Sequence, residues 1–235
     1  MSVYPLIFVA VLTAVLPPLH ARELPATRAE IRLLAFQPDL ATDEAYVHDP
    51  DAPAETVAIK VSIKTYLNHE FATVKLTGKR IVISTKPERA SLTRSKEVLG
   101  VAVLVDGVRS AILLFLPASP NGKSRCQIMV IDDSKRAFPA GSFRVSNLSP
   151  QPVRIVLEEK PYDFKPGEVQ LITDPPTRAG NQSGMKAFAF HDEIWQRIGS
   201  GIWPAPGTNR VVQVLFSNTV KGQVQLRAFD DVPPR

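Results

Sequence analysis

Two stretches of the chain decide the fold, because one repeats the other. Arg109 to Asp133 reads RSAILLFLPASPNGKSRCQIMVIDD, and Arg210 to Asp231 reads RVVQVLFSNTVKGQVQLRAFDD. Each begins with a long apolar strand, passes through a glycine turn into an alternating strand, and ends on two aspartates. The alternative is a coincidence between two hairpins of similar composition. We favour a true structural repeat, with one copy at the end of each half of the chain.

The spacing of the repeat indicates the size of its unit. Phe115 matches Phe216, Gly122 matches Gly222, and the aspartate pairs match, at offsets of 101, 100 and 98 residues. A unit of about 100 residues is the size of an immunoglobulin-like sandwich. Strands that alternate can each cover only one face, so two sheets must pack face to face. The sequence therefore predicts an all-β protein with two tandem immunoglobulin-like antiparallel β-sandwich domains, at residues 28–135 and 138–231.

The rest of the chain fits short strands better than helices. It contains 21 prolines and 12 glycines, and no segment keeps a helical period over the length of a helix. The clearest strand spans residues 57–68, where Val57, Ile59, Val61 and Ile63 alternate with polar residues. Residues 37–55 are expected to form a long acidic loop.

Turn residues predict where the chain reverses. Thr77-Gly78-Lys79 predicts a hairpin between strands at 71–76 and 80–85, and Asp106-Gly107 predicts one between strands at 98–105 and 108–116. A short helical turn competes with a strand only at residues 192–198.

The N-terminus has the pattern of a secretory signal peptide over residues 1–21. The apolar stretch from Leu6 to Leu16 is eleven residues long, which is too short to span a bilayer as a helix, and Pro17 and Pro18 follow it. No Lys or Arg precedes the stretch, so a retained membrane anchor is the alternative. No later stretch has the length of a transmembrane segment. We expect an exported protein, periplasmic or extracellular, and Cys126 as a lone cysteine excludes an intramolecular disulfide.

Two groups of residues are candidates for ligand binding. Trp195 and Trp203 are eight residues apart, so in one regular strand they share a face and could stack on sugar rings or pack in the core. A basic segment at residues 75–96 could meet phosphate or uronate groups, or could protect an exposed sheet edge. Its candidate ligand-binding residues are Lys79, Arg80, Arg89 and Arg94.

Catalytic and metal sites find little support in the sequence. His191-Asp192-Glu193 is a tight cluster of titratable residues, but a metal would need further ligands from elsewhere. There is no Gly-x-Ser-x-Gly elbow, phosphate-binding glycine loop or Cys-x-x-Cys pair. Aromatic residues do not interleave with the basic ones, which argues against nucleic acid as a partner. We predict no catalytic residue, no metal and no cofactor.

The second half of the chain carries a family resemblance. Residues 138–149, FPAGSFRVSNLS, followed by Pro152-Val153 and the Pro166-Gly167 turn, resemble a pattern in exported bacterial proteins of unknown function. That resemblance implies a β-sandwich without a known activity. A signal peptide with two sandwiches in a basic chain is also similar to periplasmic pilus-assembly chaperones, which anchor a client's C-terminus with a basic pair between their domains.

These observations favour a non-catalytic exported protein that binds or scaffolds something in the cell envelope. The expected partners are an envelope protein or an anionic glycan. One alternative is a periplasmic chaperone or adhesion-assembly factor, and another is a carbohydrate-binding module or carbohydrate-active enzyme.

Overall fold

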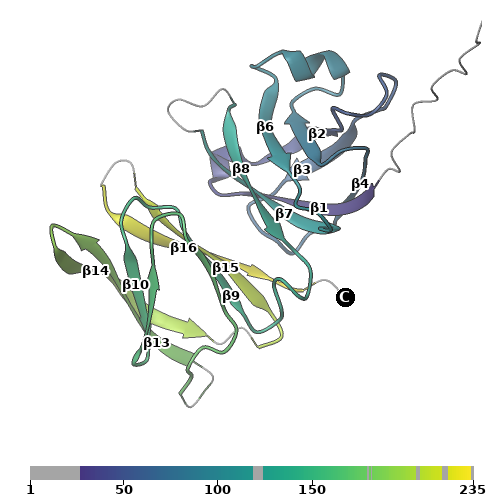
Figure 1. Ribbon diagram of the computed structural model, residues 1–235. Coiled ribbons are helices and arrows are strands. Elements are labelled where there is room, and N and C mark those ends of the chain that lie inside the picture. Colours follow the sequence, from purple (N-terminus) through teal and green to yellow (C-terminus); the bar gives the residue numbers. More distant parts are fainter. Residues whose placement is uncertain are drawn as a thin grey trace, which may run out of the picture.

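The chain folds entirely into β-sheets and short turns. The computed structural model describes residues 27–118, 124–178, 180, 182–204, 207–218 and 222–233. Within these residues the strands form four four-stranded sheets. The same residues contain two short 3-10 helices, η1 (Pro38–Leu40) and η2 (Arg89–Thr93). The prediction of an all-β protein with two tandem β-sandwiches is confirmed (Figure 1). The predicted signal peptide lies outside the described residues.

The first domain contains strands β1 to β8 in two facing sheets. The strand order is β4-β1-β7-β8 in one sheet and β3-β2-β5-β6 in the other. Side chains from both sheets form one apolar core between them. The strands are β1 (Thr27–Ala35), β2 (Thr42–His48), β3 (Ile59–Ile63), β4 (Ala72–Leu76), β5 (Arg80–Ser84), β6 (Val98–Val103), β7 (Ser110–Pro117) and β8 (Cys126–Asp132).

The second domain repeats this arrangement strand for strand. Its sheets have the orders β12-β9-β15-β16 and β11-β10-β13-β14, which are the first domain's orders with eight added to each number. The similarity seen in one hairpin therefore extends to the topology of all eight strands. The strands are β9 (Phe143–Asn147), β10 (Val153–Leu157), β11 (Lys160–Phe164), β12 (Val169–Ile172), β13 (Gln182–His191), β14 (Ile194–Pro204), β15 (Arg210–Ser217) and β16 (Val224–Asp231).

The sequence predicted antiparallel sheets, but two strand pairs are parallel. β1 pairs with β7 in parallel, and β9 pairs with β15 in parallel. The register also corrects one detail of the repeat. The backbone N–H of Asp133 donates to the carbonyl of Ser110, and Asp231 lies opposite Arg210. Ser110 therefore corresponds to Arg210, an offset of 100 residues. Phe115 thus corresponds to Leu215 rather than to Phe216, and Gly122 lies outside the described residues.

Both hairpins predicted from turn residues are wrong. β4 pairs with β1 whereas β5 pairs with β2 and β6, so the Thr77-Gly78-Lys79 turn joins two different sheets. In the same way β6 belongs to one sheet and β7 to the other, on either side of Asp106-Gly107. A tight turn with a positive φ, +80° at Gly107, specifies a reversal of the chain but not the pairing of the flanking strands.

The acidic segment predicted as a loop contains a strand. β2 buries Ala45 and Val47, and the charged residues before them face solvent. Glu44 pairs with Lys60 on the neighbouring strand β3, and Asp43 pairs with Lys64, which directly follows that strand. β3 is shorter than predicted, since Val57 lies outside it and is 83% exposed. The carboxylates of Asp43 and Glu44 are therefore engaged in ion pairs with the adjacent chain.

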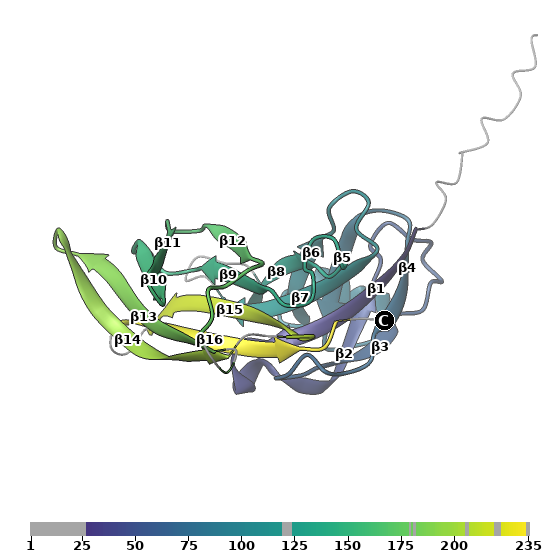
Figure 2. The same ribbon diagram turned by 90° about the horizontal axis from the view of Figure 1, so that it is seen from below.

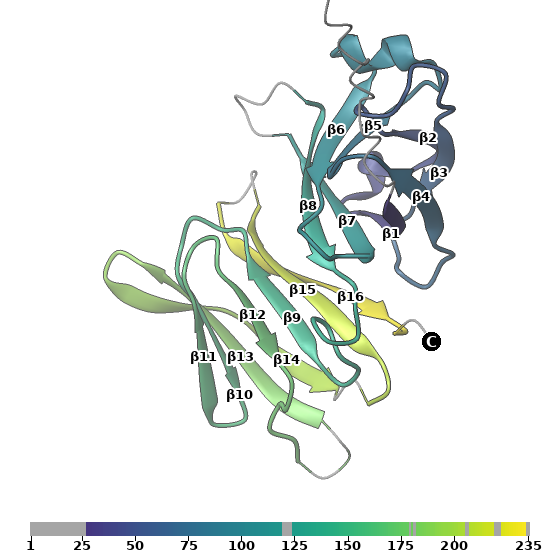
Figure 3. The same cartoon turned by 45° about the vertical axis from the view of Figure 1, so that its right-hand side comes forward.

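A third apolar cluster joins the two domains. It lies where the sheet β4-β1-β7-β8 meets the sheet β12-β9-β15-β16 (Figure 3). β7 is consequently covered on both faces, which explains its uninterrupted apolar sequence. The buried members of this cluster are Leu34, Phe36, Leu67, Ile112, Leu114, Ile131, Phe138, Val212, Val214 and Phe229.

Four charged side chains are sealed beside this cluster. Arg32 of β1 contacts the carboxylates of Asp133 at 2.9 Å and Asp231 at 2.5 Å. Arg210 of β15 contacts both of the same carboxylates, with Nε of Arg210 2.7 Å from Asp231. All four side chains are at most 2% exposed. We call these residues the buried quartet; each arginine pairs with carboxylates from both domains.

The Asn-Leu-Ser motif has a structural role. The amide nitrogen of Asn147 donates to the carbonyls of Gln151, Phe164 and Lys165 at 2.9–3.2 Å, while its amide oxygen accepts from the backbone and hydroxyl of Ser149. Asn147 is fully buried, so one side chain ties β9 to the segment before β10 and to the end of β11. The residues that carry the family resemblance therefore hold the second sandwich together.

Candidate binding surface

The two tryptophans lie on opposite faces of the sheet β11-β10-β13-β14. Trp203 is 8% exposed and stacks on Phe143 in the core, with ring centroids 4.7 Å apart. Trp195 is 36% exposed on the outer face. The expectation that they share a face is wrong because β13 and β14 contain a bulge. Ala187 lies opposite Gly199 but Phe188 lies opposite Arg197, so Ile198 is an extra residue that reverses the alternation.

Trp195 belongs to a platform that crosses the sheet. The guanidinium carbon of Arg154 on β10 lies 4.5 Å from the centre of the Trp195 ring on β14. Because β13 separates these strands, the two side chains meet above β13. There Phe190 lies directly opposite Trp195 in the register, with ring centroids 5.2 Å apart. We call Arg154, Asp163, Phe190 and Trp195 the aromatic platform.

An ion pair fixes the cationic end of this platform. Arg154 donates from Nε and an Nη to the two oxygens of Asp163, at 2.6 and 2.8 Å. This bidentate bond holds the pKa of the Asp163 carboxyl below its ordinary value. All four strands of the sheet therefore contribute to one ordered, solvent-facing surface. It projects away from the first domain along the β13–β14 hairpin (Figure 2).

The turn at the end of this hairpin is a strand reversal rather than a helical turn. Asp192 and Glu193 both have a positive φ, 48° and 62°, as in a two-residue hairpin turn. His191 is exposed, and its ring nitrogen lies 3.3 Å from a carboxylate oxygen of Asp192. In the part of the chain that the structure describes, no group of three or more His, Cys, Asp or Glu is arranged to hold a metal ion.

The basic segment of the first domain does not form one anion site. Lys79 pairs with Asp106 at 2.5 Å, Arg80 with Asp51 at 3.6 Å, and Arg94 with Glu97 at 3.3 Å. Arg89 donates to the backbone carbonyls of residues 49, 50 and 53. Among the residues that the structure describes, no acceptor is shared by two of these four cations. Part of the acidic segment and part of the basic segment thus neutralise each other.

His48, next to this segment, predicts a pH dependence of stability. Its side chain is 5% exposed and hydrogen-bonded to Ser84. Burial lowers the pKa of His48 below the ordinary 6.5, and the positive charge of Arg89 lowers it further. The hydrogen bond to the Lys86 carbonyl and the negative charge of Glu88 act in the opposite direction without reversing the shift. The unfolded chain then binds a proton more readily. We expect the free energy of unfolding to be highest above about pH 6.5 and to fall with decreasing pH through the lower pKa of the folded state.

Urea unfolding at about pH 7.5 and about pH 5 tests this expectation. His48→Gln should reduce the difference between the two pH values. His69→Gln is the comparison variant. Burial also lowers the pKa of His69, so this variant should reduce the pH dependence of stability by a separate amount. An unchanged pH dependence in His48→Gln would contradict the assignment.

The arginines between the domains are not open to a ligand. Pilus-assembly chaperones use a basic pair at that position, and Arg32 and Arg210 lie there. Each is, however, bonded to Asp133 and Asp231 and sealed from solvent. A client carboxylate would have to displace a buried aspartate, so the buried quartet acts as a clamp between the domains.

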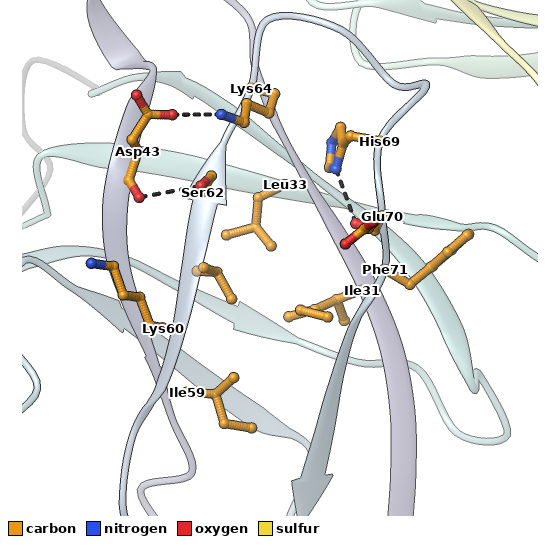
Figure 4. Close-up of a pocket in the computed structure, with 12 residues that line it drawn as sticks. Ile31, Leu33, Asp43, Ile59, Lys60, Ser62, Lys64, His69, Glu70 and Phe71 are labelled. Atoms are coloured by element: carbon orange, nitrogen blue, oxygen red, sulfur yellow. Dashed lines mark hydrogen bonds and ion pairs between the residues drawn. The ribbon is translucent and has the colours of Figure 1, made fainter.

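The first sandwich also contains a groove lined by residues of β1, β3 and the start of β4. It measures about 630 Å³ and lies between β3 and β4. Figure 4 shows Ile31 and Leu33 at its floor, with Lys64 and Asp43 across from His69. Lys64 is paired with Asp43 at 2.5 Å, and His69 bonds to the carbonyl of Glu70. Lys64 is thus held by Asp43, and Nδ1 of His69 by the carbonyl of Glu70.

Within the described ranges, no helix has the length and apolar character needed to span a membrane. No protein-family model matches the sequence, and no curated protein matches it. Among solved structures, one match is a Bacteroides uniformis protein described provisionally as a cell adhesion protein. It is 10% identical, and the match covers 89% of this chain and 98% of that chain, with a TM-score of 0.21. A TM-score this low does not establish a shared fold.

Proposed function

We propose that this chain is a non-catalytic, exported binding or scaffolding protein of the cell envelope. The outer face of the sheet β11-β10-β13-β14 is its binding surface. The observation that carries this proposal is the aromatic platform, in which Trp195 and Phe190 remain 36% and 37% exposed although neighbouring side chains hold them in place. Ordered aromatic side chains at a surface are typical of interaction sites.

The shape of the surface supports binding rather than catalysis. It is an open sheet face, and the carboxylate of Asp163, which belongs to the aromatic platform, is bonded to Arg154. A general acid or base must reach the atom that it protonates or deprotonates, and Asp163 is held by its partner. Export rests on the apolar stretch at residues 6–16, and that part of the proposal stands on the sequence.

Sedimentation with isolated cell envelopes tests the proposed function. The mature chain should sediment with envelopes from its own organism, and Trp195→Ala should lower the bound fraction several-fold. Tyr66→Ala is the matched control, since Tyr66 is an exposed aromatic residue of the first domain at 52%. Equal binding by both variants would remove the surface from consideration. Turnover in a hydrolase-substrate screen, abolished by one substitution, would overturn the non-catalytic role.

A further inference from the structure

The aromatic platform is flanked by two exposed cations, Lys186 and Arg197. Arg197 lies opposite Phe188 on the neighbouring strand, and Lys186 lies opposite Val156. Phe188, Phe190 and Lys186 alternate on β13 with the buried Ala187 and Ala189, so they belong to the outer face. Within the described residues, neither Lys186 nor Arg197 makes an ion pair. Both charges are available to a ligand.

The outer face carries an excess of positive charge. Arg154, Lys186 and Arg197 lie there with the carboxylate of Asp163, which is already bonded to Arg154, and the neighbouring carboxylate of Glu158 is paired with Arg178. The carboxylates of the hairpin turn lie beyond the Phe190–Trp195 pair, at the far end of the hairpin. A ligand lying along β13 and β14 would therefore meet aromatic rings first and then two unpaired cations.

We propose that the outer face binds an acidic polysaccharide, with sugar rings packed on Trp195 and Phe190 and carboxylates paired with Arg197 and Lys186. This inference rests on the proposed function and names its ligand class. A pyranose ring has an apolar C–H face that packs on an indole, and a guanidinium binds a carboxylate through two parallel hydrogen bonds. An open sheet face suits a long chain, because the polymer can pass over it without threading.

The acidic turn argues against an anionic membrane as the occupant. Ile194, which is 58% exposed, follows Asp192 and Glu193 at the tip of the hairpin. Inserting that tip into an anionic bilayer would bring two carboxylates against the negatively charged headgroups. Charge complementarity at Arg197 and Lys186, away from the tip, favours a polyanion that lies flat along the strands.

The test is binding of the mature chain to polygalacturonate, with its fully methyl-esterified form as the matched neutral polymer. We expect the acidic form to bind about tenfold more tightly. Trp195→Ala should weaken binding of both forms, whereas Arg197→Gln and Lys186→Gln should weaken only the acidic form and reduce its salt dependence. Arg125→Gln removes an exposed cation of the first domain and should change nothing.

Several results would overturn the inference. Equal affinity for the acidic and esterified polymers would remove the acidic specificity and leave the proposed function standing. An equal loss in Arg125→Gln and Arg197→Gln would show nonspecific attraction. Tighter binding to anionic vesicles or to a single-stranded oligonucleotide, abolished by Trp195→Ala, would assign the surface to another class of ligand. If the chain bound envelopes through Trp195 but did not bind the acidic polymer, the proposal of an acidic polysaccharide as the ligand would also be overturned.

Discussion

Replacing Arg32 by methionine is expected to lower the free energy of unfolding by about 3–5 kcal/mol. Arg32 is 2% exposed and bonded to two carboxylates that are 0% exposed. Its removal leaves Asp133 and Asp231 facing each other with one cation, Arg210, in place of two. A buried charge without its partner cannot recover the hydration that it lost on folding.

The surroundings of Arg32 leave little room for relaxation. Its guanidinium also donates to the carbonyl of Leu67 at 2.8 Å and lies 4.7 Å from the centre of the Phe71 ring. Arg210 is held in the same way, by the carbonyl and the ring of Phe138. Methionine fills part of the volume but donates no hydrogen bond, so the loss is electrostatic rather than steric.

A charge-balanced variant separates the cost of an unpaired charge from the value of the buried quartet. Arg32→Met combined with Asp133→Leu removes one cation and one anion and leaves Arg210 bonded to Asp231 at 2.7 Å. We expect the double variant to recover most of the stability lost in Arg32→Met, since balanced buried pairs are often replaceable by apolar residues. Urea unfolding of the wild-type chain and both variants measures this, and a double variant less stable than Arg32→Met would contradict it.

The buried quartet left a trace in the sequence that local patterns could not interpret. Arg32 interrupts the apolar run of β1, and both repeats end on paired aspartates. Each feature is ordinary alone, because a strand with one solvent-facing side normally carries charged residues on that side. Only the packing of the two domains turns that outward face into an interior. Sequence periodicity reports that a face differs from its opposite but not what covers it.

The same limit explains the successes and errors of the fold prediction. The apolar hairpins β7–β8 and β15–β16 were predictable because their alternation and turns are local. The partner of β6 was not, since Asp106-Gly107 fixes the reversal and leaves the choice of sheet to the core. β2 was predicted as a loop because the acidic residues Asp43 and Glu44 dominate its start and it has few buried apolar residues. The bulge at Ile198 places Trp195 on the face opposite Trp203. Gly199 beside it is a residue type that often marks a bulge, but a glycine alone does not fix where the extra residue lies.

Truncating Trp203 to alanine is expected to lower the free energy of unfolding by about 3–5 kcal/mol, whereas Trp195→Ala should cost less than about 1 kcal/mol. Trp203 stacks on Phe143 at an interplanar angle of 29° within the second core. Its loss removes a large apolar contact and leaves a cavity between the sheets. Trp195 gives up only a half-exposed contact with Phe190 and the contact with Arg154.

Because the chain contains two tryptophans, each can be observed in the absence of the other. Trp195→Phe leaves Trp203 as the sole indole, which acrylamide should quench weakly. Trp203→Phe leaves Trp195, which should be quenched strongly and should respond when the acidic polymer binds. Phenylalanine preserves part of the packing against Phe143, so this variant should remain folded where Trp203→Ala is marginal. Equal quenching of both indoles would contradict their placement on opposite faces, and with it the bulge that turns Trp195 towards a ligand.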